Sequence, residues 1–130
     1  MLTNSLSTEV RTFIDENISS YEDLQVLLLM HDHPGRKWDA SDIAEQLRIE
    51  PFSASQHLMK LCKKGLVAHK DSSGALYDFE YTPYPEAKEQ HISALAMAFE
   101  RARADVVDYI FKKSRTQFQS FADAFNFKKD

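Results

Sequence analysis

The chain has 130 residues, of which 43% are hydrophobic and 12% aromatic, with three glycines and one cysteine. This length and composition favour one globular, mainly helical domain with extensions, and one cysteine excludes an internal disulfide and a cysteine-cluster zinc site. No apolar run is long enough to span a membrane and no N-terminal signal pattern is present, so we expect a cytoplasmic protein.

The formal net charge of −4 argues at first against a nucleic-acid partner, because phosphate neutralisation needs lysine and arginine. The charges are distributed unevenly: residues 1–50 hold four basic and ten acidic side chains, whereas residues 51–130 hold twelve and ten. Residues 51–70 contain four lysines, two histidines and no acidic residue. This basic segment is typical of a DNA-binding surface and predicts moderate, salt-sensitive binding.

Two helices are predicted in the first 33 residues. The first lies within residues 1–18, has Ser7 or Thr8 as its N-cap, and has an apolar face made of Leu6, Val10, Phe13, Ile14 and Ile18. The second begins at Ser19 or Ser20, where Asp23 completes a capping arrangement, and ends at Pro34-Gly35. Because the second helix is apolar on most sides, we expect it to be buried.

A helix-turn-helix pattern follows a short strand predicted at residues 36–38. Asp39 caps the first helix, whose inner face is formed by Ile43, Ala44 and Leu47. The second helix starts at Pro51 and ends at Gly65, and its inner positions are Ala54, Leu58, Leu61 and Cys62. This spacing predicts that Cys62 is a buried core thiol, and the alternative is a redox sensor whose thiolate is stabilised by Lys63 or Lys64.

The sequence AEQL followed by SxSQHLxxLxxxGLV resembles the second and third helices of bacterial winged-helix transcription regulators, the broad group that includes the MarR, ArsR and PadR types. The resemblance covers residues 21–82. It implies a mainly α fold with a small β-wing: an N-terminal helical extension (1–18), a winged helix-turn-helix DNA-binding domain (19–82), and a C-terminal dimerisation helix with a Phe-rich tail (83–130).

After Gly65 the hydrophobic period changes from that of a helix to that of a strand. Residues 67–70 and 75–81 are predicted to pair across a turn at residues 71–74, with Tyr77, Phe79 and Tyr81 on one face and Asp78 and Glu80 on the other. This hairpin is the predicted wing.

One helix is predicted from about residue 85 to Lys113. It carries a heptad seam formed by Ile92, Leu95, Phe99, Ala102, Val106 and Tyr109. A helix of this length cannot bury both faces on a small domain, so we predict a homodimer with this seam as its interface. The tail that follows carries Phe118, Phe121 and Phe125, which either pack within the dimer or dock another protein.

In a helix-turn-helix domain the second helix enters the major groove. The predicted contacts are Gln56 for base readout; Ser53, Ser55 and His57 on the same outward face with Met59; Lys60, Lys63 and Lys64 on the DNA backbone; and Lys70, Ser72 and Ser73 from the wing. We therefore predict a homodimeric DNA-binding transcription regulator that recognises a palindromic operator in double-stranded DNA.

The alternative is a winged-helix protein-protein interaction module that does not bind DNA specifically. A small apolar effector could bind near Phe13, Trp38, Tyr84 and Phe99. We expect no cofactor and no metal, because His31-Asp32-His33 offers too few ligands for a closed site. No catalytic arrangement is recognisable from residue spacing, so we expect no enzymatic activity.

Overall fold

The computed structural model describes residues 6–69 and 79–113. Helix α1 (Thr8–Asn17) begins at the predicted cap Ser7, whose Oγ accepts a hydrogen bond of 3.1 Å from the Val10 N–H. Helix α2 (Tyr21–His31) begins at Ser20, whose Oγ accepts from the Asp23 N–H. Both caps satisfy a backbone donor that the first helical turn leaves unpaired.

The helix-turn-helix pair follows strand β1 (Lys37–Trp38) directly. Helix α3 (Ala40–Leu47) starts with a capping box, in which Asp39 accepts from the Asp42 N–H at 2.7 Å and Asp42 accepts in return from the Asp39 N–H. Helix α3 ends at Arg48 in the left-handed conformation. Helix α4 (Pro51–Lys63) then begins with proline at a first-turn position, where its missing N–H costs nothing.

Helix α4 is followed by Gly65, at a φ of +79°. This conformation favours glycine, and a Cβ at this position would lie 3.0 Å from the carbonyl oxygen of Tyr84. The Gly65 carbonyl also accepts a hydrogen bond from the Tyr84 N–H at 2.9 Å. Gly65 therefore ends α4 and permits the close approach of the segment that leads to the last helices.

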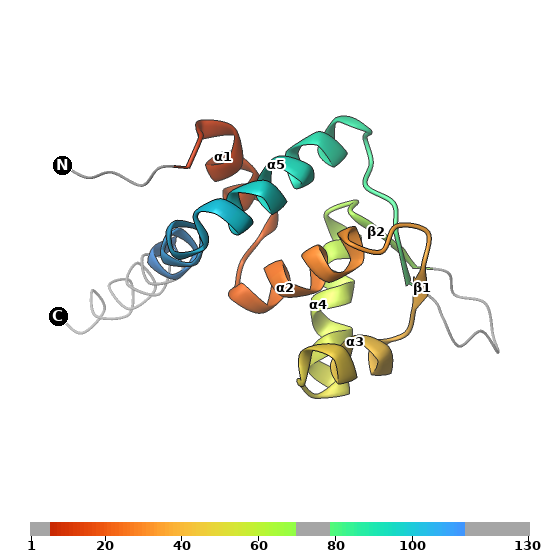
Figure 1. The fold of residues 1–130 in the computed structure, drawn as a ribbon. Helices are drawn as coiled ribbons and strands as arrows, with labels where there is room; N and C mark the ends of the chain where they lie inside the picture. Colours follow the sequence, from red (N-terminus) through yellow and green to blue (C-terminus); the bar gives the residue numbers. More distant parts are fainter. Residues whose placement is uncertain (1–5, 70–78, 114–130) are drawn as a thin grey trace, which may run out of the picture.

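A small antiparallel sheet has the strand order β1-β3-β2 (Figure 1). Strand β2 (Val67–His69) pairs with β3 (Phe79–Tyr81) so that Val67 lies opposite Tyr81, and β1 pairs with β3 so that Trp38 lies opposite Phe79. Phe79 and Tyr81 are buried, as their alternation predicts. The predicted turn at 71–74 lies outside the described residues.

The C-terminal helical region is not one continuous helix, so that prediction was wrong. Helix α5 (Ala87–Arg101) ends at Ala102, whose backbone is non-helical at φ −139° and ψ 54°, and residues 103–113 form a further helical segment. The Ala102 carbonyl accepts from the Asp105 and Val106 N–H groups and starts this second segment. The break buries Val106 and Ile110 in the core of the same chain.

One hydrophobic cluster runs through the whole described part of the chain and includes buried residues from all three predicted segments. Helix α2 supplies its centre with Leu24, Val26, Leu27 and Met30, all without exposed surface. Helix α1 packs against α5, and α2 packs against α4. Figure 1 shows α1 and residues 103–113 at the end of the molecule opposite the sheet. Among the described helices, none is long and apolar enough to cross a membrane.

The capping box of α3 gives a direct test of local stability. Asp39→Ala should lower the free energy of unfolding by about 1 kcal/mol, because it leaves a backbone donor of α3 without its partner. Urea denaturation followed by circular dichroism measures this change. The exposed neighbour Ser41 provides the control, since Ser41→Ala should leave the midpoint almost unchanged, and equal effects of the two substitutions would contradict a role for the cap.

Candidate nucleic-acid interface

Helix α4 has one buried face and one exposed face. Its buried residues Ala54, Leu58 and Leu61 lie in the hydrophobic cluster, where α4 packs against α2 and α3. Gln56, Lys60, Lys63 and Lys64 are exposed, as predicted, and Ser53 and Ser55 are half-buried. The packing of α4 therefore fixes its core positions and leaves the amide and the lysines accessible on the outside.

A hollow of about 400 Å³ lies along the exposed side of α4. The residues that line it are Ser55, Gln56, His57, Met59, Lys60 and Lys63. Residues 51–63 contain no acidic side chain, so the lysines of α4 have no opposing charge on their own helix. A positive helix that presents hydrogen-bonding and apolar groups has the composition of a surface that binds a nucleic-acid groove.

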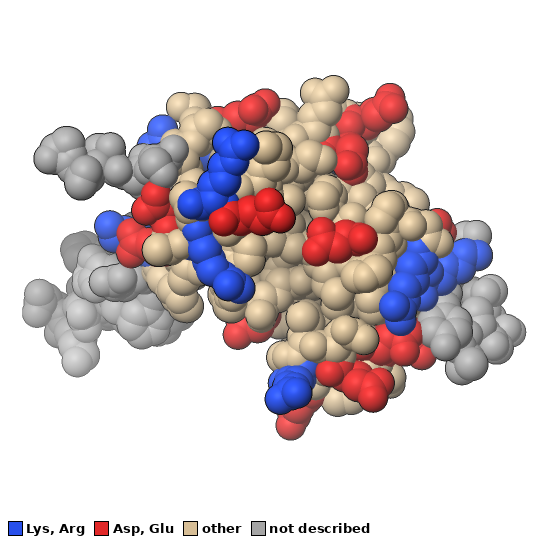
Figure 2. All heavy atoms as spheres, viewed as in Figure 1, with Lys and Arg blue, Asp and Glu red and all other residues tan. Residues whose placement is uncertain are grey.

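One face of the molecule carries mixed charge. Figure 2 shows that basic side chains on this face stand in separate groups with acidic side chains between them. Mixed charges of this kind do not provide a continuous positive track for a phosphate backbone.

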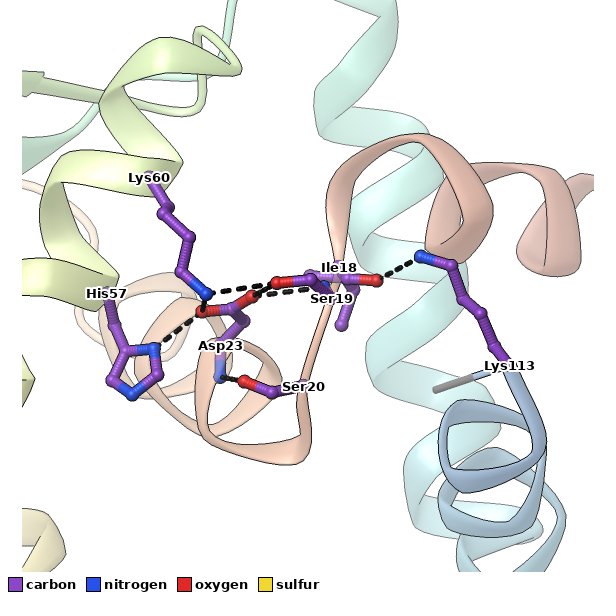
Figure 3. A network of polar contacts seen from close by, with 7 residues as sticks. All are labelled: Ile18, Ser19, Ser20, Asp23, His57, Lys60 and Lys113. Atoms are coloured by element: carbon purple, nitrogen blue, oxygen red, sulfur yellow. Dashed lines mark hydrogen bonds and ion pairs between the residues drawn. The ribbon is translucent and has the colours of Figure 1, made fainter. Parts of the chain in front are cut away.

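His57 does not point outward with Gln56, because it contacts a buried carboxylate at the start of α2 (Figure 3). The His57 side chain is 15% exposed and its Nδ1 lies 2.6 Å from the Asp23 carboxylate, which is 1% exposed. Lys60 approaches the same carboxylate to 3.4 Å and donates a hydrogen bond of 3.0 Å to Ser19 Oγ. These contacts fix α4 against the first turn of α2.

The Asp23 carboxylate also accepts hydrogen bonds from Ser19, at 3.0 Å from the backbone N–H and 2.5 Å from the hydroxyl. Burial alone would raise the pKa of Asp23, but the hydrogen bonds from Ser19 and His57, with the charge of Lys60, outweigh burial and hold it below its ordinary value. Asp23 is thus ionised at neutral pH and fully partnered.

Lys113 connects the C-terminal helical segment to the same junction between α1 and α2 (Figure 3). Its Nζ donates to the carbonyl oxygens of Ile14, at 3.2 Å, and Ile18, at 2.6 Å. These carbonyls belong to the end of α1, where a cation complements the helix dipole. Burial lowers the pKa of the Lys113 ammonium. Lys113 also lines a hollow of about 250 Å³ with Lys60, Lys63 and Lys64.

Other predicted site residues are placed differently. Lys70, Ser72 and Ser73 lie outside the described residues. Of the predicted dimer seam, Ile92, Leu95 and Val106 are buried within the single chain, whereas Phe99, Ala102 and Tyr109 are half-buried. The dimer interface therefore stays a prediction.

The aromatic residues expected near an effector do not form one pocket. Phe13 and Trp38 are buried in the core, Tyr84 is exposed, and Phe99 lies under the guanidinium of Arg103. A hollow of about 410 Å³ between α1 and the start of α5 is lined by Phe13 and His91 among others. In the described part of the chain no group of three potential ligand side chains could hold a metal ion, and burial raises the pKa of the Cys62 thiol.

The sequence did not identify the contact of Asp23 with α4 or the exposure of Phe52. An acidic residue in the first turn of a helix is explained by capping and by the helix dipole, so Asp23 gave no sign of its contact with α4. Phe52 follows Pro51 at the start of α4 and is 72% exposed. The signal that could have identified Phe52 was its outward position next to the proline, seven residues before Met59.

A capped helix pair followed by an antiparallel sheet defines a winged helix-turn-helix fold. No protein-family profile and no curated protein matches the sequence, but solved structures do. A Staphylococcus aureus MepR F27L mutant bound to an oligodeoxyribonucleotide is 14% identical with a TM-score of 0.55, and the match covers 94% of this chain and 88% of that one.

Two further structures give similar values. MepR, described as a transcription regulator of the S. aureus multidrug efflux pump MepA, is 15% identical with a TM-score of 0.53 over 94% of this chain and 91% of that one. MepR bound to ethidium bromide is 14% identical with a TM-score of 0.50 over 98% and 100%. At these identities the likeness shows the fold, and it confirms the predicted class, mainly α with a small β-sheet.

The Asp23 contacts predict a pH-dependent contribution to stability. Asp23→Asn should lower the free energy of unfolding by about 2 kcal/mol at pH 7, because it removes a charged hydrogen-bond acceptor from a buried position. The pKa is lowered in the folded state, so this contribution is present above the unfolded pKa and should disappear as the pH falls below about 4. Urea denaturation of both proteins from pH 7 to pH 3 measures the difference.

Asp42→Asn is the matched control, because Asp42 is also an acidic residue in the first turn of a helix but has no partner on α4 among its hydrogen bonds. A constant difference between wild-type protein and Asp23→Asn across this pH range would contradict the contribution of the ionised carboxylate.

Proposed function

We propose that the protein is a DNA-binding transcription regulator in which residues 51–64 enter the major groove. The observation that carries this proposal is the outer face of α4, where Gln56, Lys60 and Lys63 are exposed on a helix free of acidic residues. In helix-turn-helix proteins the second helix of the pair reads base edges. The likeness of the fold to MepR, one structure of which is bound to an oligodeoxyribonucleotide, supports this assignment.

Each residue has a chemical role in this proposal. The amide of Gln56 can pair with an adenine edge, and the half-buried hydroxyls of Ser53 and Ser55 donate to bases or phosphates. Lys63 and Lys64 neutralise the backbone, and the wing at residues 70–75 makes a second backbone contact. Lys60 has a double role, since it also contacts Asp23 and so positions α4.

The regulator acts as a homodimer in this proposal. Two copies of α4 related by a twofold axis would contact half-sites about 34 Å apart, one turn of DNA, which requires a palindromic operator. Because Ile92, Leu95 and Val106 already fill the core of one chain, the contact between copies would use exposed apolar residues such as Met97 and Phe111, which are 51% and 53% exposed. A small apolar effector could bind in the hollow between α1 and α5.

The exposed lysines provide the test of DNA binding. Lys63→Gln/Lys64→Gln should flatten the slope of log affinity against log salt concentration by about 1.8, because each lost phosphate contact removes about 0.9. Fluorescence anisotropy with a mixed-sequence duplex over a salt series measures the slope. Lys60 is left unchanged because its loss would also disturb Asp23.

The control is Arg101→Gln/Lys112→Gln, which removes the same charge from exposed positions in the C-terminal region. It should leave the slope unchanged. Absence of duplex binding by wild-type protein at low salt would overturn the proposal and favour the interaction module that does not bind DNA.

The dimer is tested by sedimentation. Wild-type protein at micromolar concentration should have twice the mass of the chain, and Met97→Glu should weaken association by at least about tenfold, because a charge would replace an apolar contact. Met59→Glu makes the same change at an exposed position on α4 and should leave association unchanged. A wild-type protein with the mass of a single chain would contradict the dimer.

A further inference from the structure

Two large apolar side chains are exposed on the outer face of α4. Phe52 is 72% exposed and Met59 is 40% exposed. At 100° per residue, positions 52, 56, 59 and 63 fall within an arc of about 60°, so Gln56 lies between the two apolar side chains and Lys63 continues the same stripe. Phe52, Gln56 and Met59, with Lys63 at the end, therefore form a stripe along the surface that the proposed function places against DNA.

Exposure of this extent needs an explanation. Burying a phenylalanine or methionine side chain stabilises a folded protein, and Phe52 in particular does not gain this stabilisation in the single chain. Apolar groups that cluster on a surface and are bordered by polar residues mark a contact with a partner. Here the border consists of Ser55 and Lys60, which are uncharged and positive.

The chemistry of the stripe matches one kind of base pair. In the major groove adenine offers an acceptor and a donor that suit a glutamine amide, and thymine offers a methyl group that suits an apolar side chain. G·C pairs have no methyl group, and they offer strong acceptors that suit arginine or lysine. The stripe presents an amide and two apolar groups, and its lysine stands at its end.

The spacing is also compatible. Phe52 and Met59 are seven residues apart, which corresponds to about 10 Å along the helix axis. This distance equals about three base-pair steps of 3.4 Å. Two thymine methyl groups three steps apart, with an adenine between them, would meet Phe52, Met59 and Gln56 together.

We propose that Phe52 and Met59 are specificity residues that contact thymine methyl groups and that, with Gln56, they select A·T pairs in each half-site. This inference rests on the proposed function, because it assigns the base pairs that α4 reads. The lysines supply affinity for any duplex, whereas the stripe supplies the preference.

The test uses duplexes that differ only in the methyl group. A 30-base-pair alternating A·T duplex, the same duplex with deoxyuridine in place of thymidine, and an alternating G·C duplex are titrated with wild-type protein. Deoxyuridine keeps base pairing and charge and removes the C5-methyl group. Wild-type protein should bind the thymidine duplex about fourfold more tightly for each methyl contact, or about 15-fold for two.

In Phe52→Ala, the ratio of the affinity for the thymidine duplex to the affinity for the deoxyuridine duplex should be about fourfold lower than in wild-type protein. This comparison separates a methyl contact from a change in DNA shape, because a shape effect would persist in the variant. Gln56→Ala should reduce the preference for A·T over G·C. Tyr84→Ala removes an aromatic side chain that is 78% exposed and lies outside α4 and outside the proposed dimer contact, and it should leave both ratios unchanged. Thermal unfolding verifies that each variant is folded.

Equal wild-type affinity for the thymidine and deoxyuridine duplexes, with salt-dependent binding intact, would overturn this inference and leave the proposed function standing. A preference for thymidine that is undiminished in Phe52→Ala would also overturn it. If the wild-type protein binds none of the three duplexes at low salt, the proposed function itself is overturned and the exposed stripe is assigned to a protein partner.

Discussion

The position of α4 depends on a carboxylate that is removed from solvent. Asp23 is ionised, 1% exposed, and bonded at once to its own helix start and to two side chains of α4. Removing a charge from water is costly unless its partners replace the lost hydration. Any displacement of α4 along α2 would separate the carboxylate from His57 and Lys60, so the orientation of the outer face of α4 is linked to this one group.

The same side chain also restricts the rotation of α4 about its own axis. Leu58 and Leu61 pack α4 against the core through non-directional hydrophobic contacts, which tolerate small rotations of the helix. Hydrogen bonds to Asp23 have strict geometry and restrict that rotation. The rotation of α4 about its axis is therefore fixed by the hydrogen bonds to Asp23 and by apolar packing in the core. This rotation sets the direction in which Gln56 and Phe52 project.

Local sequence patterns were sufficient to predict most of the helices, their ends and their buried faces. Ser7 and Ser20 act as caps, and each was one of two predicted candidates. Asp39 caps α3 and Gly65 ends α4, both as predicted, because these roles depend on residues within one turn. The buried positions of α4 followed from helical spacing, and exposure of Gln56 followed with them.

Contacts between distant segments were not predictable in this way. His57 has the spacing of an outward residue, and only the tertiary approach of Asp23, 34 positions earlier, turns it inward. The break at Ala102 occurs without proline or glycine, since burial of Val106 and Ile110 outweighs the preference of alanine for a continuous helix. The predicted seam does have heptad spacing, but three of its residues, Ile92, Leu95 and Val106, are buried in the core of the single chain.

The hydrogen bonds of Lys113 to Ile14 and Ile18, and that of Tyr109 to Asp15, join groups 94 to 99 positions apart. Contacts of such long sequence separation form late, because the intervening chain must first be closed into a loop. During synthesis on the ribosome, α1 emerges before α2 to α5 but cannot complete its packing until residues 103–113 have followed. Helix α1 is thus made before the other described helices and completes its packing after most of them.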